Sequence, residues 1–147
     1  MTSPFANPAG ETGAAADAYT RALLDLLGDR DPFEVQEATV PALRRIVEEL
    51  DEETLCRPEA PGKWSILEVI AHLADSELVY GYRLRLMVAH DEPEVPGYDQ
   101  DLWARRLRYR QADPHQQLDR MEAMRQANLD FLRGLTEDEW QRIGHHS

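Results

Sequence analysis

The chain has 147 residues, of which 42% are hydrophobic and 30% charged, as in a soluble globular protein rather than a disordered one. The formal net charge of −12 argues against a nucleic-acid partner, because phosphate binding needs a concentrated basic face. No apolar run approaches the roughly 20 residues of a membrane-spanning helix, and the N-terminus lacks the features of a secretory signal. We therefore expect a cytoplasmic protein without a membrane partner.

Residues 1–14 are rich in proline, glycine and small polar residues, which predicts a flexible N-terminal tail. Residues 15–147 are of a length that one domain accommodates, and we expect a single helical domain there. The spacing of apolar residues predicts a short first helix over residues 15–27, and Gly28 follows it as a C-terminal stop.

A second helix is predicted to begin at Asp31-Pro32, since an N-cap followed by proline at the first helical position is a common start. Its apolar residues recur as far as Leu50. Pro41 lies inside this run, where it removes one backbone donor and clashes with the preceding turn. We therefore expect a kink or a break near Thr39.

The only cysteine, Cys56, excludes an intrachain disulfide. It lies in a predicted connector, and its neighbours do not indicate an activated thiolate. We interpret it as a partly buried residue without a catalytic role.

The longest helical pattern runs from Trp64 or Ser65 to about His90, and Ser65 with Glu68 forms a capping box at its start. At about 100° per residue, one face carries an apolar stripe made of Ile66, Ile70, Leu73, Tyr80, Leu84 and Met87. His72 lies on the flank of this stripe, together with Ser76, Val79 and Arg83. Glu77 falls near its middle, where a carboxylate must be paired, ligated or protonated.

Three further helices are predicted in the last third of the chain. A short one follows the N-cap Asp99, and a long one runs from Asp113-Pro114 to about Arg133. The last is a short turn opened by a capping box at Thr136. No segment shows the alternation of a strand, so we expect an all-α helical bundle.

His72 is the only histidine inside a strongly periodic segment. Glu68 and Asp75 lie four residues before it and three after it, on the same helix face, so a carboxylate could accompany the imidazole. A lone histidine on a helix flank is more often a hydrogen-bonded boundary residue. Spacing alone leaves both interpretations open.

Several segments resemble the DinB-like superfamily, particularly its YfiT-like branch. They are Pro61-Gly62-Lys63-Trp64-Ser65, His72-Leu73-Ala74-Asp75-Ser76, Tyr82-Arg83, Tyr98-Asp99 with Trp103, Asp31-Pro32 and Leu135-Thr136 to Trp140. The resemblance implies an up-down four-helix bundle with a long crossover connection, commonly a homodimer. It also implies a divalent metal, zinc or nickel, that activates a water or a thiol. The family includes metal-dependent hydrolases and low-molecular-weight-thiol transferases, so it implies a small-molecule or thiol substrate.

Of the three histidine ligands that the resemblance implies, one maps onto His72. The other two form an H-x-x-x-H pair on a final helix, and this sequence contains no such pair. Gly144-His145-His146 resembles the Gly-x-His segment that precedes that helix. The resemblance therefore predicts a bundle that lacks its fourth core helix and self-associates through the exposed groove.

Two hypotheses follow for function. In the first, the chain is a DinB-like metal-dependent hydrolase or thiol transferase with His72 as a metal ligand. In the second, it is a non-catalytic helical module that binds a partner or dimerises.

Three charged residues near His72 have competing interpretations. Asp75 is a weak catalytic candidate or orients the imidazole as a hydrogen-bond acceptor. Arg83 either meets an anionic substrate or forms a salt bridge. For Glu77 we favour a structural ion pair with an arginine over a catalytic role.

Overall fold

The computed structural model describes residues 14–146, with side chains from Asp17 onward. The chain divides into two compact units, residues 1–36 and residues 37–147. The expected tail, except for Ala14, lies outside the described residues, and the single domain stays a prediction.

The first unit contains helix α1, Ala14–Leu27, whose bounds confirm the prediction to within one residue. Gly28 follows with a φ of 60°, a left-handed conformation that glycine adopts without a steric cost, and its amide donates to Leu24 O. The Asp31 carboxylate accepts the Phe33 amide at 2.7 Å, which confirms the predicted cap.

Helix α2, Pro32–Glu49, runs without interruption through Pro41, so a break near Thr39 is wrong. Val40 and Val47, before and after the proline, are both buried in the hydrophobic core. Burial of these two side chains stabilises the helix on both sides of Pro41, and this contribution is absent from local helix propensity.

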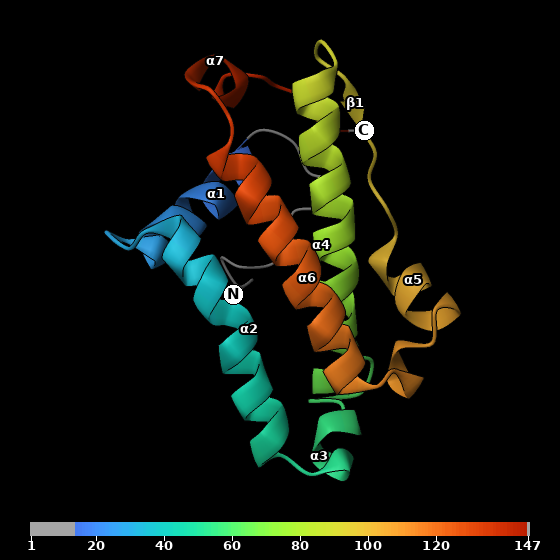
Figure 1. Cartoon of the computed structure of the whole chain (residues 1–147). Coiled ribbons are helices and arrows are strands. Elements are labelled where there is room, and N and C mark those ends of the chain that lie inside the picture. Colours follow the sequence, from blue (N-terminus) through green and yellow to red (C-terminus); the bar gives the residue numbers. More distant parts are fainter. Residues whose placement is uncertain (1–13, 147) are drawn as a thin grey trace. The chain divides into compact units, whose positions relative to one another are not determined.

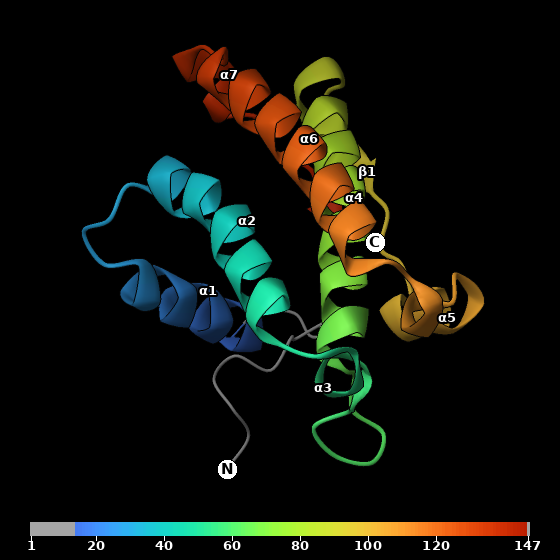
Figure 2. The ribbon, with the colours of Figure 1, turned by 60° about the horizontal axis from the view of Figure 1, so that its bottom comes forward.

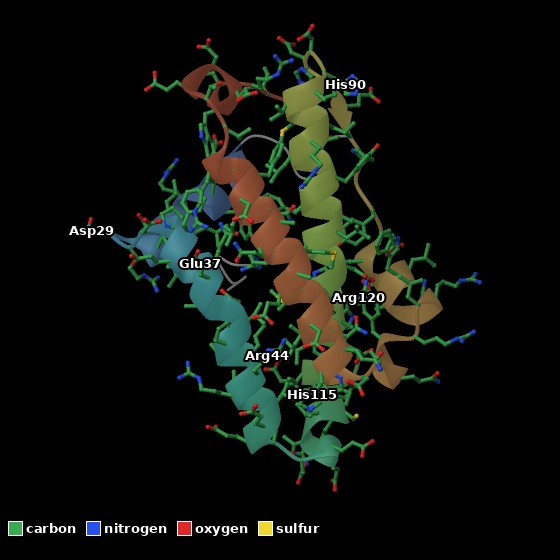
Figure 3. All side chains as sticks on the ribbon, in the orientation of Figure 1. Asp29, Glu37, Arg44, His90, His115 and Arg120 are labelled. Carbon is green, nitrogen blue, oxygen red and sulfur yellow. The ribbon has the colours of Figure 1, made fainter. Side chains whose placement is uncertain are left out.

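Three long helices, α2, α4 (Ile66–Ala89) and α6 (Pro114–Arg133), make up most of the second unit (Figures 1 and 2). Helices α4 and α6 lie side by side and pack so closely that Gly81 meets the Asn128 side chain. Buried core residues come from all three long helices and from α3, Glu52–Cys56, and they are Val40, Val47, Leu55, Ile70, Ala74, Leu118 and Met121. Arg44 on α2 reaches α6, where it binds Asp119 and Glu122 at 2.7 Å (Figure 3).

Cys56 lies inside α3 and is exposed, so both its expected burial and its expected place in a connector are wrong. Leu55 takes the buried position of this one-turn helix. The next residue points about 100° away from it, which turns the thiol outward.

The connection from α4 to α6 is long, as expected, and contains α5 (Gln100–Arg106) and the 3₁₀ helix η1 (Tyr109–Gln111). It also contains strand β1, Glu94–Val95, which pairs in parallel with β2, His145–His146, after helix α7, Glu137–Trp140. These two-residue strands lie outside the predicted elements, because a strand this short shows no alternating pattern. The all-α class is confirmed, since every longer element from residue 14 to 146 is a helix.

Capping chemistry set the helix starts as predicted. Both capping boxes form, at Ser65 with Glu68 and at Thr136 with Glu139. No helix among residues 14–146 has the length and apolarity that crossing a membrane requires.

Candidate functional site

His72 lies half-buried on α4, in a cluster of aromatic and hydroxyl side chains. Its Nε2 is 3.3 Å from the Ser76 hydroxyl, which is in turn 3.1 Å from the Tyr98 hydroxyl. The Trp64 ring approaches the imidazole edge-on with centroids 4.9 Å apart, and Tyr98 packs on Trp103 at 4.5 Å. The loop before α4 and the connection after it therefore enclose His72 from two sides.

Burial lowers the pKa of His72 below its ordinary value of 6.5, against the opposing charges of Asp75 and Asp101. The imidazole is consequently neutral near pH 7, which is the state in which histidine binds a metal. Its Nδ1 is buried and has no hydrogen-bond partner within residues 14–146. An orphaned ring nitrogen of this kind is expensive to bury, and it marks this position for a function or a missing partner.

The Asp75 carboxylate binds two residues from the connection and α6 instead of the His72 ring. Its Oδ2 accepts the Tyr109 hydroxyl and its Oδ1 accepts the Arg120 guanidinium, both at 2.7 Å. Burial, followed by the hydrogen bond to Asp75, raises the pKa of the Tyr109 hydroxyl. Asp75 thus joins three segments of the chain and acts on His72 only through its charge. The hypothesis that Asp75 orients the imidazole by accepting a hydrogen bond is therefore wrong.

Arg83 holds the loop that covers the site. Its Nε and Nη2 both donate to the Pro96 carbonyl, at 3.0 and 2.5 Å, and its guanidinium lies 6.0 Å from the centre of the Tyr98 ring. The expected salt bridge is replaced by a backbone acceptor, and this contact fixes the segment that carries Tyr98.

Glu77 is buried and paired with Arg125 of α6, which confirms the structural interpretation. Glu68 is buried as well. Its carboxylate accepts hydrogen bonds from the Ser65 amide and from Arg110 Nε, both at 2.9 Å. The carboxylates at the helical spacings from His72 are therefore both engaged with arginines.

The other histidines lie away from His72 along the chain. His90 caps the end of α4, His115 is in the first turn of α6, and His145 lies 3.3 Å from Glu92. Within residues 14–146 there is no group of three His, Cys, Asp or Glu side chains that could hold a metal ion. A catalytic zinc site needs three protein ligands, so the described residues supply one imidazole and do not complete a metal site.

The family model of the DinB superfamily matches residues 36–147, about three quarters of the sequence. The chain belongs to the DinB superfamily. It is 30% identical over 73% of its length to "Putative metal-dependent hydrolase YfiT" of Bacillus subtilis, covering 61% of that protein. A similar match, 28% identical over 69% of the chain and covering 57% of the relative, is to "Putative metal-dependent hydrolase" of Geobacillus thermodenitrificans.

Among solved structures, YfiT from Bacillus subtilis matches with a TM-score of 0.74 and 27% identity, over 78% of this chain and 65% of that one. That protein is described as "a probable metal-dependent hydrolase with an unusual four-helix bundle topology". The chain therefore spans about three fifths of the length of these relatives. These matches confirm the DinB-like fold.

Sequence reasoning missed the residues that hold Asp75. Tyr109 and Arg120 are 34 and 45 residues away in the sequence. No local spacing reports such a contact, because only the packing of α6 and η1 on α4 brings these side chains together. A partial signal existed in the presence of Asp75 on the buried side of a helix, where a carboxylate needs a cation.

Proposed function

We propose that the protein is a metal-dependent hydrolase of the DinB superfamily and that His72 is one of its metal ligands. One observation carries the proposal: a half-buried imidazole, neutral near pH 7, whose Nδ1 is buried without a partner within the described part of the chain. The names of the relatives support the reaction class. The remaining ligands are then side chains that are not gathered at His72 in this structure.

Zinc or nickel is the metal we propose, and a low-molecular-weight-thiol transferase is the alternative activity within the same family. A divalent metal lowers the pKa of a water or thiol that it binds, and both activities would use the nucleophile that results. The two differ in substrate. Release of product from an ester or amide in the absence of added thiol supports the hydrolase, and a strict requirement for thiol supports the transferase.

Metal content tests the role of His72 directly. Protein that has been loaded with zinc or nickel and freed of excess metal is expected to retain about one ion per chain or per dimer, measured by elemental analysis. His72→Ala should lose that ion. His115→Ala is the matched control, since His115 lies at the start of another helix, and it should retain the metal.

Metal-free wild-type protein at neutral pH, or equal metal retention in the His72 and His115 variants, would overturn the proposed ligand. Thermal unfolding with and without metal gives a second readout, because a ligand that binds only the folded state raises its stability.

A second candidate function is a non-catalytic helical module, and it is favoured by the lack of three clustered ligand side chains within residues 14–146. It predicts that His72→Ala changes packing alone. In that case added metal does not change the unfolding midpoint of the wild-type protein or of His72→Ala.

We further propose that the protein forms a homodimer in the cytoplasm. Leu78 and Tyr82 are exposed one helical turn apart on α4. A second chain that packs on this side of α4 would remove both apolar side chains from water.

A further inference from the structure

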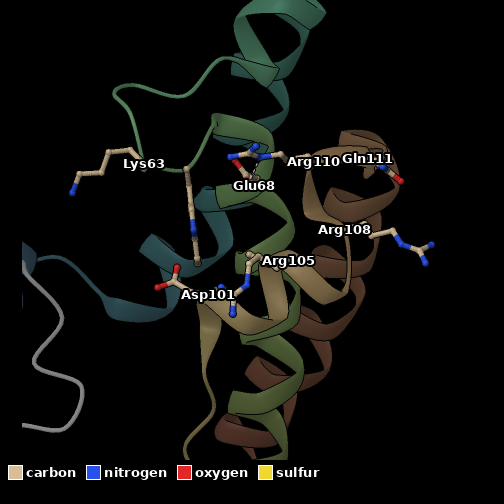
Figure 4. A pocket seen from close by; sticks show the side chains of 10 residues that line it. Lys63, Glu68, Asp101, Arg105, Arg108, Arg110 and Gln111 are labelled. Carbon is tan, nitrogen blue, oxygen red and sulfur yellow. Dashed lines mark hydrogen bonds and ion pairs between the residues drawn. The ribbon is translucent and has the colours of Figure 1, made fainter.

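A pocket of about 600 Å³ lies beside the start of α4, between the loop that precedes this helix, α5 and η1 (Figure 4). Trp64 and Ala104 supply apolar wall, and Gly62 leaves part of it without a side chain. This volume lies in the range of small-molecule sites. Because Trp64 also contacts His72, one side chain separates the pocket from the candidate metal ligand.

The lining of this pocket is basic although the protein is strongly acidic. Four cationic side chains line it, against two carboxylates; the cations are Lys63, Arg105, Arg108 and Arg110. They come from three different segments, namely the loop before α4, the end of α5 and the residues around η1. In a chain with a formal net charge of −12, this is a local reversal of charge.

Most of this positive charge is not neutralised inside the protein. Arg110 is held by the buried Glu68 at 2.9 Å. By contrast, Lys63, Arg105 and Arg108 form no ion pair with any described residue from 14 to 146. Figure 4 shows Lys63 and Arg108 extending outward to opposite sides, with Arg110 at Glu68. Arg110 is fixed by Glu68 although 69% of its side chain is exposed, and the other three cations are exposed around the pocket. An anion that enters the pocket therefore meets positive charge from several sides of its mouth.

The backbone at Arg108 explains how this side chain reaches the pocket. Arg108 has φ 58° and ψ 49°, a left-handed conformation that costs a non-glycine residue free energy. No side-chain hydrogen bond caps η1 at this residue. Arg108 directly follows Leu107, the C-cap of α5, so the left-handed residue ends this helix and turns the chain into η1, which places Arg108 beside the pocket.

We propose that this pocket binds a small organic polyanion, with carboxylate or phosphate groups held by Arg105, Arg108 and Lys63 and its carbon skeleton against Trp64. This site requires no metal and none of the chemistry assigned to His72. It therefore stands or fails separately from the proposed hydrolase activity.

Calorimetric titration of the metal-free 147-residue chain tests the proposal, with pyrophosphate as the phosphate probe and tricarballylate as the carboxylate probe. At low salt at least one probe should bind with a dissociation constant below about 1 mM, and tryptophan fluorescence should change because Trp64 lines the pocket. Raising the salt to about 0.2 M should weaken binding several-fold, since exposed charges are screened. The probe that binds more tightly identifies the anionic group.

The double variant Arg105→Gln/Arg108→Gln is expected to weaken binding at least tenfold. Arg106→Gln is the matched control, because Arg106 is exposed on the same helix but does not line the pocket, and it should bind within twofold of wild type.

Two results would overturn the proposal: no binding of either probe up to about 10 mM, or an equal loss of binding in Arg106→Gln. Circular dichroism on every variant confirms the fold, and exposed arginines are not expected to change it.

Discussion

The buried ion pair between α4 and α6 gives a quantitative test of how this bundle is held together. Arg125 donates to Glu77 Oε1 from Nε at 2.8 Å and also from Nη2, and Asn128 Nδ2 lies 3.2 Å from Oε2. Only 8% of the Glu77 side chain and 13% of the Arg125 side chain are exposed. The Arg125→Met substitution keeps a long side chain and removes the charge.

Removing one partner from a buried pair costs about 3–5 kcal/mol, because the other charge stays buried without compensation. Asn128 still donates to Glu77 in the variant, so we expect the lower end, about 3 kcal/mol. For a chain of this length that corresponds to a fall of roughly 10 °C in the unfolding midpoint. Arg125→Met/Glu77→Gln should recover part of the loss, since a neutral amide is less costly to bury than a carboxylate.

Arg133→Met is the matched control on the same helix. Arg133 binds Glu37 at 2.6 Å, but the two side chains are 44% and 45% exposed. Exposed pairs contribute at most about 1 kcal/mol. Urea unfolding measures both variants. Equal losses for Arg125→Met and Arg133→Met, or no recovery in the double variant, would refute the argument that burial makes the Glu77 pair the more important one.

Three further predictions concern packing, protonation and assembly. Gly81→Ala places a methyl group 3.0 Å from Asn128 Cγ and closer still to its Oδ1, and we expect the free energy of unfolding in urea to fall by about 1–3 kcal/mol. Gly134→Ala is the control and should be nearly neutral, because the nearest atom to its methyl group would be 3.5 Å away. Equal effects of the two substitutions would contradict this prediction. Because burial lowers the pKa of His72, the unfolded chain binds a proton there that the folded protein does not, so stability present above pH 6.5 is lost as pH falls. His72→Gln should therefore flatten the decline of unfolding free energy below pH 6.5, and an unchanged slope would exclude His72 as its source. Light scattering at micromolar concentration should give the mass of two chains, and the mass of one chain would count against the homodimer.

The helix starts and the family were readable from the sequence. A capping box at Ser65, a second one at Thr136 and the aspartate-proline pair at Asp113 each act within four residues, and all three open the helices predicted for them. Local chemistry of this kind depends on backbone groups that the chain itself places nearby. Glu77 was predictable for another reason: helical periodicity places it in the apolar stripe, and a buried carboxylate needs a compensating partner such as an arginine.

Tertiary packing decided the rest. Glu77 pairs with Arg125, and Asp75 is held by Tyr109 and Arg120. These partners lie between 34 and 48 residues away in the sequence, so local patterns do not identify them. Helix α2 passes through Pro41 because a buried core stabilises both sides of it. The surroundings of His72 have the same origin. Its burial, its lowered pKa and its orphaned Nδ1 arise only when the loop before α4 and the connection after it fold against this helix, since desolvation is a property of the folded chain and not of the residue.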